Sequence, residues 1–141
     1  MTLTREQMDR SIDEHFGYEA ADDIEGVLAT LAPDATHDIV GWPFGPTHGR
    51  ENARPFYEAT FGGFADSKVT GTKRLYGENF LVDESVVEGT VKGRLFGLEG
   101  KGRRVQFRLL HVIEFAGDGK IQRENAWLDL AALMRQLPAE Q

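Results

Sequence analysis

The chain has 141 residues, of which 40% are hydrophobic and 28% are charged, a balance that is ordinary for one globular domain with a sizeable core. Its 16 basic and 23 acidic residues give a net charge of −7, which argues against partners such as nucleic acid or an anionic membrane surface. The sequence has no cysteine, so it excludes disulfides, thiolate metal sites and a cysteine nucleophile.

No stretch reaches the roughly 18 apolar residues that a transmembrane helix needs. The first residues, MTLTREQMDRSIDEHF, lack the continuous apolar run of a signal peptide. We therefore expect a single domain over residues 1–141 in a cytoplasmic protein.

Helical patterns fill the first part of the chain. Residues 4–20 predict a helix capped by Thr4, with a buried stripe that includes His15. A second helix is expected to begin after Asp22 or Asp23, to bury Leu31 and to stop at Pro33. A short strand over Thr36–Val40, a Pro/Gly loop over 41–49 and a third helix over Glu51–Phe61 follow.

From about residue 68 the hydrophobic period changes to two. Strands are expected near 68–76, 79–83, 85–96, 103–116 and 120–128, with a last short helix capped by Asp129. Helices grouped on one face of an antiparallel or mixed sheet make an α+β fold. Because so long a sheet must curl, we expect a cone-shaped sheet packed on the N-terminal helices and enclosing an apolar pocket.

The strand RRVQFRLLHVIEF places a single imidazole in an apolar face. That face holds Val105, Phe107, Leu109, His111, Ile113 and Phe115. A histidine there must be hydrogen-bonded or line a wet pocket. We favour a cavity position for His111, where a neutral imidazole can exchange protons near neutral pH, over a satisfied core histidine.

The following strand, KIQRENAWL, pairs with this one through a Gly-Asp-Gly turn. A slip of one residue decides whether Glu124 or Asn125 lies beside His111. Glu124 would form a carboxylate–imidazole dyad and Asn125 a neutral pair, and we favour Glu124 slightly.

Two further candidates come from the N-terminal half. His37 and Asp38 are consecutive on a short strand, so one of them should face inward unless Ile39 or Val40 does so. We favour Asp38, because a carboxylate at the edge of an apolar cavity can shuttle protons. His15 is either a core-edge histidine or a donor that points into the cavity.

Aromatic residues supply the remaining pocket candidates. Trp42 and Phe44 are in the loop after the first strand and could roof the pocket. Phe56 and Tyr57 favour the core, although the Tyr57 hydroxyl could bond inward. With His37, Phe107 and Leu109 they form the predicted ligand pocket. The four histidines lack metal-ligand spacing, so we expect no metal.

Several segments resemble known families. The stretches DIEGVLATLAPDAT, HGRENARPFY and VIEFAGDGKIQRENAW are similar to bacterial ketosteroid isomerases, and WLDLAALMRQL is similar to the ending of SnoaL-like polyketide cyclases. Both groups belong to the NTF2-like superfamily. The resemblance implies an NTF2-like α+β barrel with an apolar pocket, no cofactor and a homodimer formed through the outer face of the sheet.

The resemblance also places site residues. The catalytic tyrosine of the isomerases falls on His15, their oxyanion-hole aspartic acid on His111 and their supporting tyrosine on Tyr57. Their general base falls on Ile39 or Asp38. The catalytic aspartate of the cyclases falls on or beside Asn125, and a histidine equivalent to His111 is kept.

We therefore expect an enzyme that uses no cofactor and acts on a small apolar carbonyl, polyketide-like or epoxide compound. It would be of the isomerase, cyclase or hydrolase type, with Asp38 as base, His111 as acid beside Glu124 or Asn125, and His15 in support. The alternative is a ligand-binding or dimeric accessory domain of the same fold without turnover.

Overall fold

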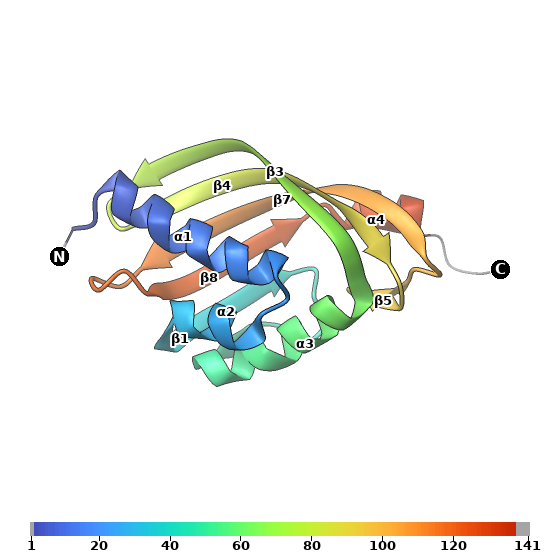
Figure 1. Ribbon diagram of the computed structural model, residues 1–141, viewed down its shortest axis with the longest axis horizontal. Helices are drawn as coiled ribbons and strands as arrows, with labels where there is room; N and C mark the ends of the chain where they lie inside the picture. The colour runs from blue at the N-terminus through green and yellow to red at the C-terminus, as the bar shows by residue number, and fades with distance from the viewer. Residues whose placement is uncertain (1, 138–141) are drawn as a thin grey trace.

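The computed structural model describes residues 2–137 as one curved sheet with helices packed against it (Figure 1). The helices are α1 (Arg5–Ala20), α2 (Ile24–Thr30), the 3-10 helix η1 (Arg50–Ala53), α3 (Arg54–Gly63) and α4 (Leu130–Gln136). The main strands are β1 (Leu31–Val40), β2 (Thr47–His48), β3 (Phe64–Gly77), β4 (Phe80–Val91), β7 (Arg103–Phe115) and β8 (Ile121–Leu128). A separate hairpin consists of β5 (Arg94–Leu95) and β6 (Leu98–Glu99).

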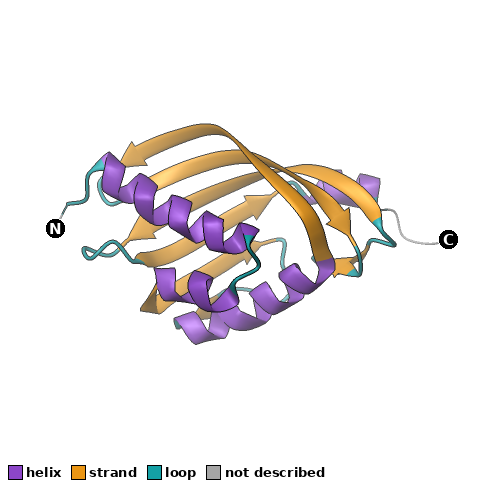
Figure 2. Cartoon of the chain, in the orientation of Figure 1, coloured by secondary structure: helices purple, strands orange, loops and turns teal. Residues whose placement is uncertain are grey.

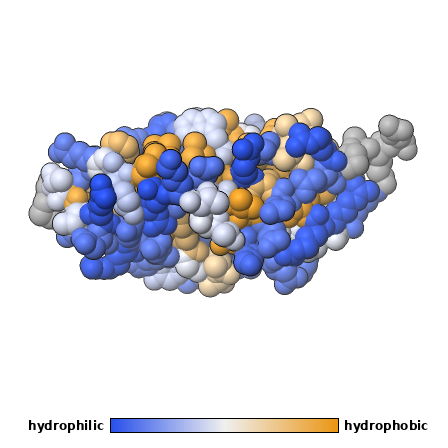
Figure 3. Space-filling view, turned by 90° about the horizontal axis from the view of Figure 1, so that it is seen from above, coloured by the Kyte–Doolittle hydropathy of each residue, from blue (hydrophilic) through white to orange (hydrophobic). Residues whose placement is uncertain are grey.

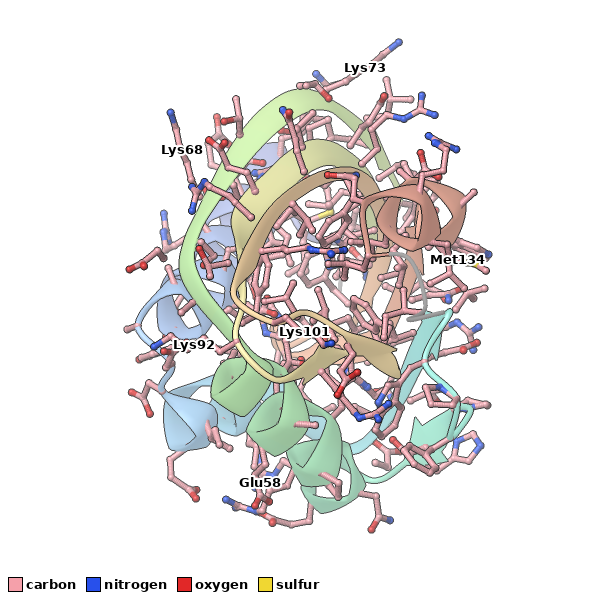
Figure 4. All side chains as sticks on the ribbon, turned by 90° about the vertical axis from the view of Figure 1, so that its right-hand side faces the viewer. Glu58, Lys68, Lys73, Lys92, Lys101 and Met134 are labelled. Carbon is pink, nitrogen blue, oxygen red and sulfur yellow. The ribbon has the colours of Figure 1, made fainter. Side chains whose placement is uncertain are left out.

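The strand order of the main sheet is β2-β1-β8-β7-β4-β3, in which β1 and β8 run parallel and the other neighbours antiparallel. The helices α1, α2 and α3 lie together on the concave side of the sheet (Figure 2). Seen from one end, β3, β4 and β7 arch over the interior side chains while α3 closes the opposite side (Figure 4). The predicted α+β cone is therefore confirmed.

Local signals determine where the N-terminal helices begin. The Thr4 hydroxyl accepts from the backbone N–H of Gln7, whose side chain in turn accepts from the backbone N–H of Thr4, a complete capping box. Asp23 caps α2 by accepting from the N–H of Gly26. Both caps agree with the sequence analysis.

The expected end of α2 at Pro33 is wrong. The helix ends at Thr30, and Leu31 is already extended and pairs with Ile121 of β8. Pro33 lies inside β1, in the stretch between Leu31 and Thr36 where the pairing register shifts. A proline has no N–H to give to a ladder, so it is tolerated at such an irregularity.

The expected break at Asp83-Glu84 is also wrong, because β4 runs through it without interruption. Asp83 faces inward and is 3% exposed. Its carboxylate is bound by Arg74 of β3 and by the Ser85 hydroxyl, so a residue that reads as a turn former in the sequence is instead a compensated acid inside the sheet.

Apolar side chains fill the space between the layers in two clusters. The larger one joins α1, α2 and α3 to the concave face of the sheet, and the smaller one lies under α4, where Leu133 and Leu137 pack against strand residues such as Val105. The view onto the side where β3 lies shows mainly hydrophilic side chains around smaller apolar patches (Figure 3). Each helix within residues 2–137 is too short or too polar to cross a lipid bilayer.

Candidate functional site

A cavity of about 480 Å³ opens between α1, α3 and the concave face of the sheet. This volume lies in the range of roughly 300–1,000 Å³ that is usual for small-molecule sites. Much of the wall is aromatic and is formed by Phe16, Phe56, Phe61, Phe64, Phe96 and Phe107. The ionisable groups in the wall are Asp13, Glu19, Asp22, Arg74, Asp83, His111 and Glu124.

Glu124 of β8 is the centre of a buried polar cluster at the base of the cavity. Its side chain is 2% exposed, and its Oε2 accepts a hydrogen bond of 2.7 Å from the Tyr57 hydroxyl. Its Oε1 lies 3.1 Å from His15 Nε2 and 3.7 Å from His111 Nε2, while Oε2 lies 3.5 Å from His37 Nε2. One carboxylate thus faces three imidazoles and a phenol.

The hydrogen-bond partners of His15 show that its ring carries both protons. The Thr30 hydroxyl donates to the carbonyl of Val27 (2.6 Å), so it must accept from His15 Nδ1–H (2.7 Å). Nε2 lies 3.1 Å from Glu124 and 3.3 Å from Glu19, both of which only accept when ionised. His15 is therefore a buried imidazolium.

The electrostatics agree with this assignment. Burial alone would lower the pKa of His15, but the charges of Glu124 and Glu19 and their hydrogen bonds outweigh burial and raise it to about 10. Burial alone would likewise raise the pKa of Glu124, but the charge and hydrogen bond of His15 hold it well below its usual value. The two groups form an ion pair at neutral pH.

A second arm of the cluster is neutral. Because the Tyr57 hydroxyl donates to Glu124, its oxygen accepts from His37 Nε2–H at 3.2 Å. Burial lowers the pKa of His37 despite the nearby charge of Glu124, and burial together with that charge raises the pKa of Tyr57. His37 and Tyr57 therefore orient the carboxylate without adding charge.

His111 is the histidine that lines the cavity. The residue is 6% exposed, and its ring packs against Phe16 with 5.1 Å between ring centroids. Nε2 faces Glu124, and Nδ1 has no hydrogen-bond partner among residues 2–137. A buried nitrogen without a partner is uncommon in a folded protein, which sets His111 apart from the other histidines of the cluster.

The structure brings together several predicted residues. His15, His111 and Glu124 share one cluster, and Glu124 rather than Asn125 is the neighbour of His111. Phe56, Phe107 and Leu109 line the cavity as expected. Tyr57 and His37 lie behind the wall, where they contact Glu124.

The inward placement of Asp38 is wrong. His37 pairs with Glu124 and faces inward, so Asp38 faces the other way, where its carboxylate lies 3.3 Å from Arg123. Asn125 is on that same outer side, and its amide donates to the backbone oxygen of Asp38. A strand alternates strictly, so His37 inside requires Asp38 outside.

The predicted roof residues are outside the cavity wall. Trp42 packs edge-on against Phe56 at 5.2 Å and against Phe44 at 5.1 Å, and Phe44 is 76% exposed. Neither is among the described residues that line the cavity. The loop over 41–49 therefore packs behind Phe56 instead of covering the opening.

Glu19 and Thr30, which contact the two ring nitrogens of His15, were not predicted as site residues. Glu19 stands four residues after His15, one helical turn away, and this spacing was a readable signal. The ligand atoms of His15, Glu19 and Glu124 lie within 4.8 Å of one another, so this set could hold a metal ion. In the hydrogen bonding described above, the Nε2–H group of His15 lies between the two carboxylates of Glu19 and Glu124.

Comparisons with known proteins agree with this architecture. The family model for SnoaL-like polyketide cyclase matches residues 8–137. A proposed SnoaL-like polyketide cyclase from Jannaschia sp. CCS1 superposes with a TM-score of 0.84 at 18% identity, over 100% of this chain and 99% of its own. TsrD from Streptomyces laurentii gives 0.83 at 20% identity, over 98% and 99%.

An LEH-like epoxide hydrolase from M. tuberculosis gives a TM-score of 0.71 at 18% identity, over 93% of this chain and 89% of its own. At identities this low, the superpositions show a shared fold alone. No curated protein matches the sequence. The family match over residues 8–137, together with the cone-shaped fold, shows that the chain belongs to the SnoaL-like polyketide cyclase family.

Proposed function

We propose that this protein is a cofactor-independent acid–base enzyme that transfers a proton to or from a small apolar compound through His111. One observation carries the proposal: His111 lies in the wall of an aromatic cavity with Nε2 3.7 Å from a buried, ionised Glu124. The substrate class that fits this wall is an apolar carbonyl, polyketide-like or epoxide compound. The family match and the epoxide-hydrolase neighbour support this choice.

Glu124 would act through His111. Because its charge faces Nε2 of His111, it would stabilise the imidazolium that forms when the His111 ring takes a substrate proton. The charge on His15 keeps Glu124 ionised throughout. A positioned acid or base of this kind contributes about 10²–10⁴-fold to a rate.

The test uses a generic proton-transfer substrate. We would incubate the protein with 2-tetralone in D₂O and follow deuteration of the ketone by mass spectrometry. His111→Gln should lower the exchange rate by about 100-fold or more, toward that of buffer. Asp38→Asn is the matched control and should keep the rate, because Asp38 faces away from the cavity.

The alternative is ligand binding without turnover. It is favoured by the engagement of both Glu124 oxygens, which leaves that carboxylate unavailable to take a substrate proton. Binding of 2-tetralone in calorimetry with no exchange above buffer would support the alternative. Unchanged exchange in His111→Gln would contradict the role of His111.

A further inference from the structure

The ionisable groups of the cavity wall are unbalanced. Five carboxylates line it, on Asp13, Glu19, Asp22, Asp83 and Glu124. The guanidinium of Arg74 in the wall and the imidazolium of His15 behind it are each already paired with carboxylates. A charged ligand therefore meets an acidic wall.

The guanidinium of Arg74 is already surrounded by carboxylates, so it does not attract an anionic ligand. It lies 2.9 Å from Asp9, 3.1 Å from Asp13 and 2.9 Å from Asp83. Three carboxylates around one guanidinium leave the group with a net negative charge. A ligand carboxylate or phosphate placed here would have to displace one of them.

The C-terminal end of α1 adds to the negative potential. Gly17, Ala20 and Asp22 of this end line the cavity, and the last turn of the helix contains no basic residue. A helix places a partial negative charge at its C-terminus, which favours a nearby cation. This contribution is independent of the side-chain carboxylates.

Asp22 occupies a position that usually holds glycine. It has φ of 54°, and the N–H groups of Asp22 and Asp23 bond to the carbonyls of Glu19 and Tyr18, which is the closing pattern of a Schellman motif. A glycine would adopt this left-handed conformation at lower cost. The chain instead keeps a carboxylate at the cavity mouth.

The rest of the wall is suited to the apolar part of a ligand. Six phenylalanines line the same cavity. Aromatic rings pack favourably against one another in offset or edge-to-face arrangements, so this part of the wall favours a ring system.

We propose that the cavity binds an organic ammonium ion, namely an amine attached to an apolar ring system. The ammonium lies at the mouth between Glu19, Asp22 and the end of α1, and the ring system packs against the phenylalanines. The inference shares its cavity with the proposed function, but it does not depend on proton transfer.

Three ligands with the same ring system test it by calorimetry at pH 7 and low salt: 2-naphthylmethylammonium, 2-naphthylmethanol and 2-naphthoate. The ammonium should bind about tenfold or more tightly than the carboxylate, with the alcohol between them. Added salt should reduce this difference, because the mouth is exposed to solvent.

Two substitutions at Asp22 separate binding from folding. Asp22→Asn should weaken ammonium binding about threefold and leave the alcohol unchanged. Asp22→Gly should weaken it equally while raising the melting temperature, because the strained backbone is relieved. Glu58→Gln, which removes an exposed carboxylate of α3 labelled in Figure 4, is the matched control and should change neither.

The proposal is overturned if 2-naphthoate binds as tightly as the ammonium, or if Asp22→Asn and Glu58→Gln affect binding alike. These measurements involve no turnover. A failure of 2-tetralone exchange would therefore leave the ammonium site intact, and a lack of ammonium preference would leave the role of His111 intact.

Discussion

Replacing Glu124 with glutamine should remove the charge that holds His15 protonated in the interior. A rise of the His15 pKa from 6.5 to about 10 contributes about 4 kcal/mol to the free energy of unfolding at pH 7. Glu19 would remain and supply part of this, so we expect a loss of about 3 kcal/mol, near the lower end of the range for breaking a buried ion pair. The melting temperature should fall by roughly 10 °C.

The assay is urea unfolding at pH 7, followed by tryptophan fluorescence. The midpoint should fall while the slope with urea stays constant, because the same surface is exposed on unfolding. The matched control is Glu114→Gln. Glu114 is 54% exposed and lies 3.5 Å from Arg123, so its removal should cost less than about 1 kcal/mol. Equal losses in the two variants would refute the assignment of Glu124 and His15 as a buried ion pair.

Three further predictions concern His15, Tyr57 and Gly63. Because its pKa is raised, His15 contributes its full stabilisation below pH 6.5, and the free energy of unfolding should fall as the pH rises toward 10. NMR of the His15 ring nitrogens should show an imidazolium at pH 8. A neutral ring at that pH would contradict the raised pKa. Tyr57→Phe removes the hydroxyl that donates to Glu124 and should cost about 1.5–3 kcal/mol in urea unfolding, whereas a loss below about 0.5 kcal/mol would show that the bond is weak. Gly63→Ala should lower the melting temperature, because the new Cβ would collide with the backbone carbonyl of Arg94. Gly62→Ala has open space around the new Cβ and should raise the melting temperature. Shifts of the same sign in the two variants would argue against the contact between Gly63 and Arg94.

The sequence predicted those parts of the fold that depend on neighbours a few residues apart. The capping box at Thr4 and the apolar face around His111 are local patterns, and both appear in the structure. The pairing of the strands that carry His111 and Glu124 also follows locally, because a short turn joins them. The turn did not decide the register, which the sequence left open between Glu124 and Asn125.

The orientation of Asp38 could not be read in the same way. Which residues of β1 face inward is set by its parallel pairing with β8, and that pairing is irregular around Pro33. The alternation of a short strand gives two equivalent choices until the partner strand selects one. Burying the ring of His37 against Tyr57 and Phe56 selects the histidine.

Charge compensation between residues that are distant in the chain could not be read from the sequence either. Asp83 looks like a turn residue until Arg74 of the adjacent strand is seen to neutralise it. His15 and Glu19 show their relation by spacing, but the other acidic partner of His15, Glu124, lies more than 100 residues further along the chain. A buried polar cluster therefore becomes visible only when the topology is known.

The two outermost strands of the sheet bear on how this protein behaves at high concentration. An edge strand with unpaired backbone groups can act as a template for aggregation, and proteins protect such edges with lysines, bulges or short strands. β3 carries Lys68 and Lys73, which project from it in Figure 4, and its pairing with β4 is interrupted twice. At the other edge β2 has only 2 residues. Both edges are thus poor templates, and edge-to-edge polymerisation of the folded protein is disfavoured.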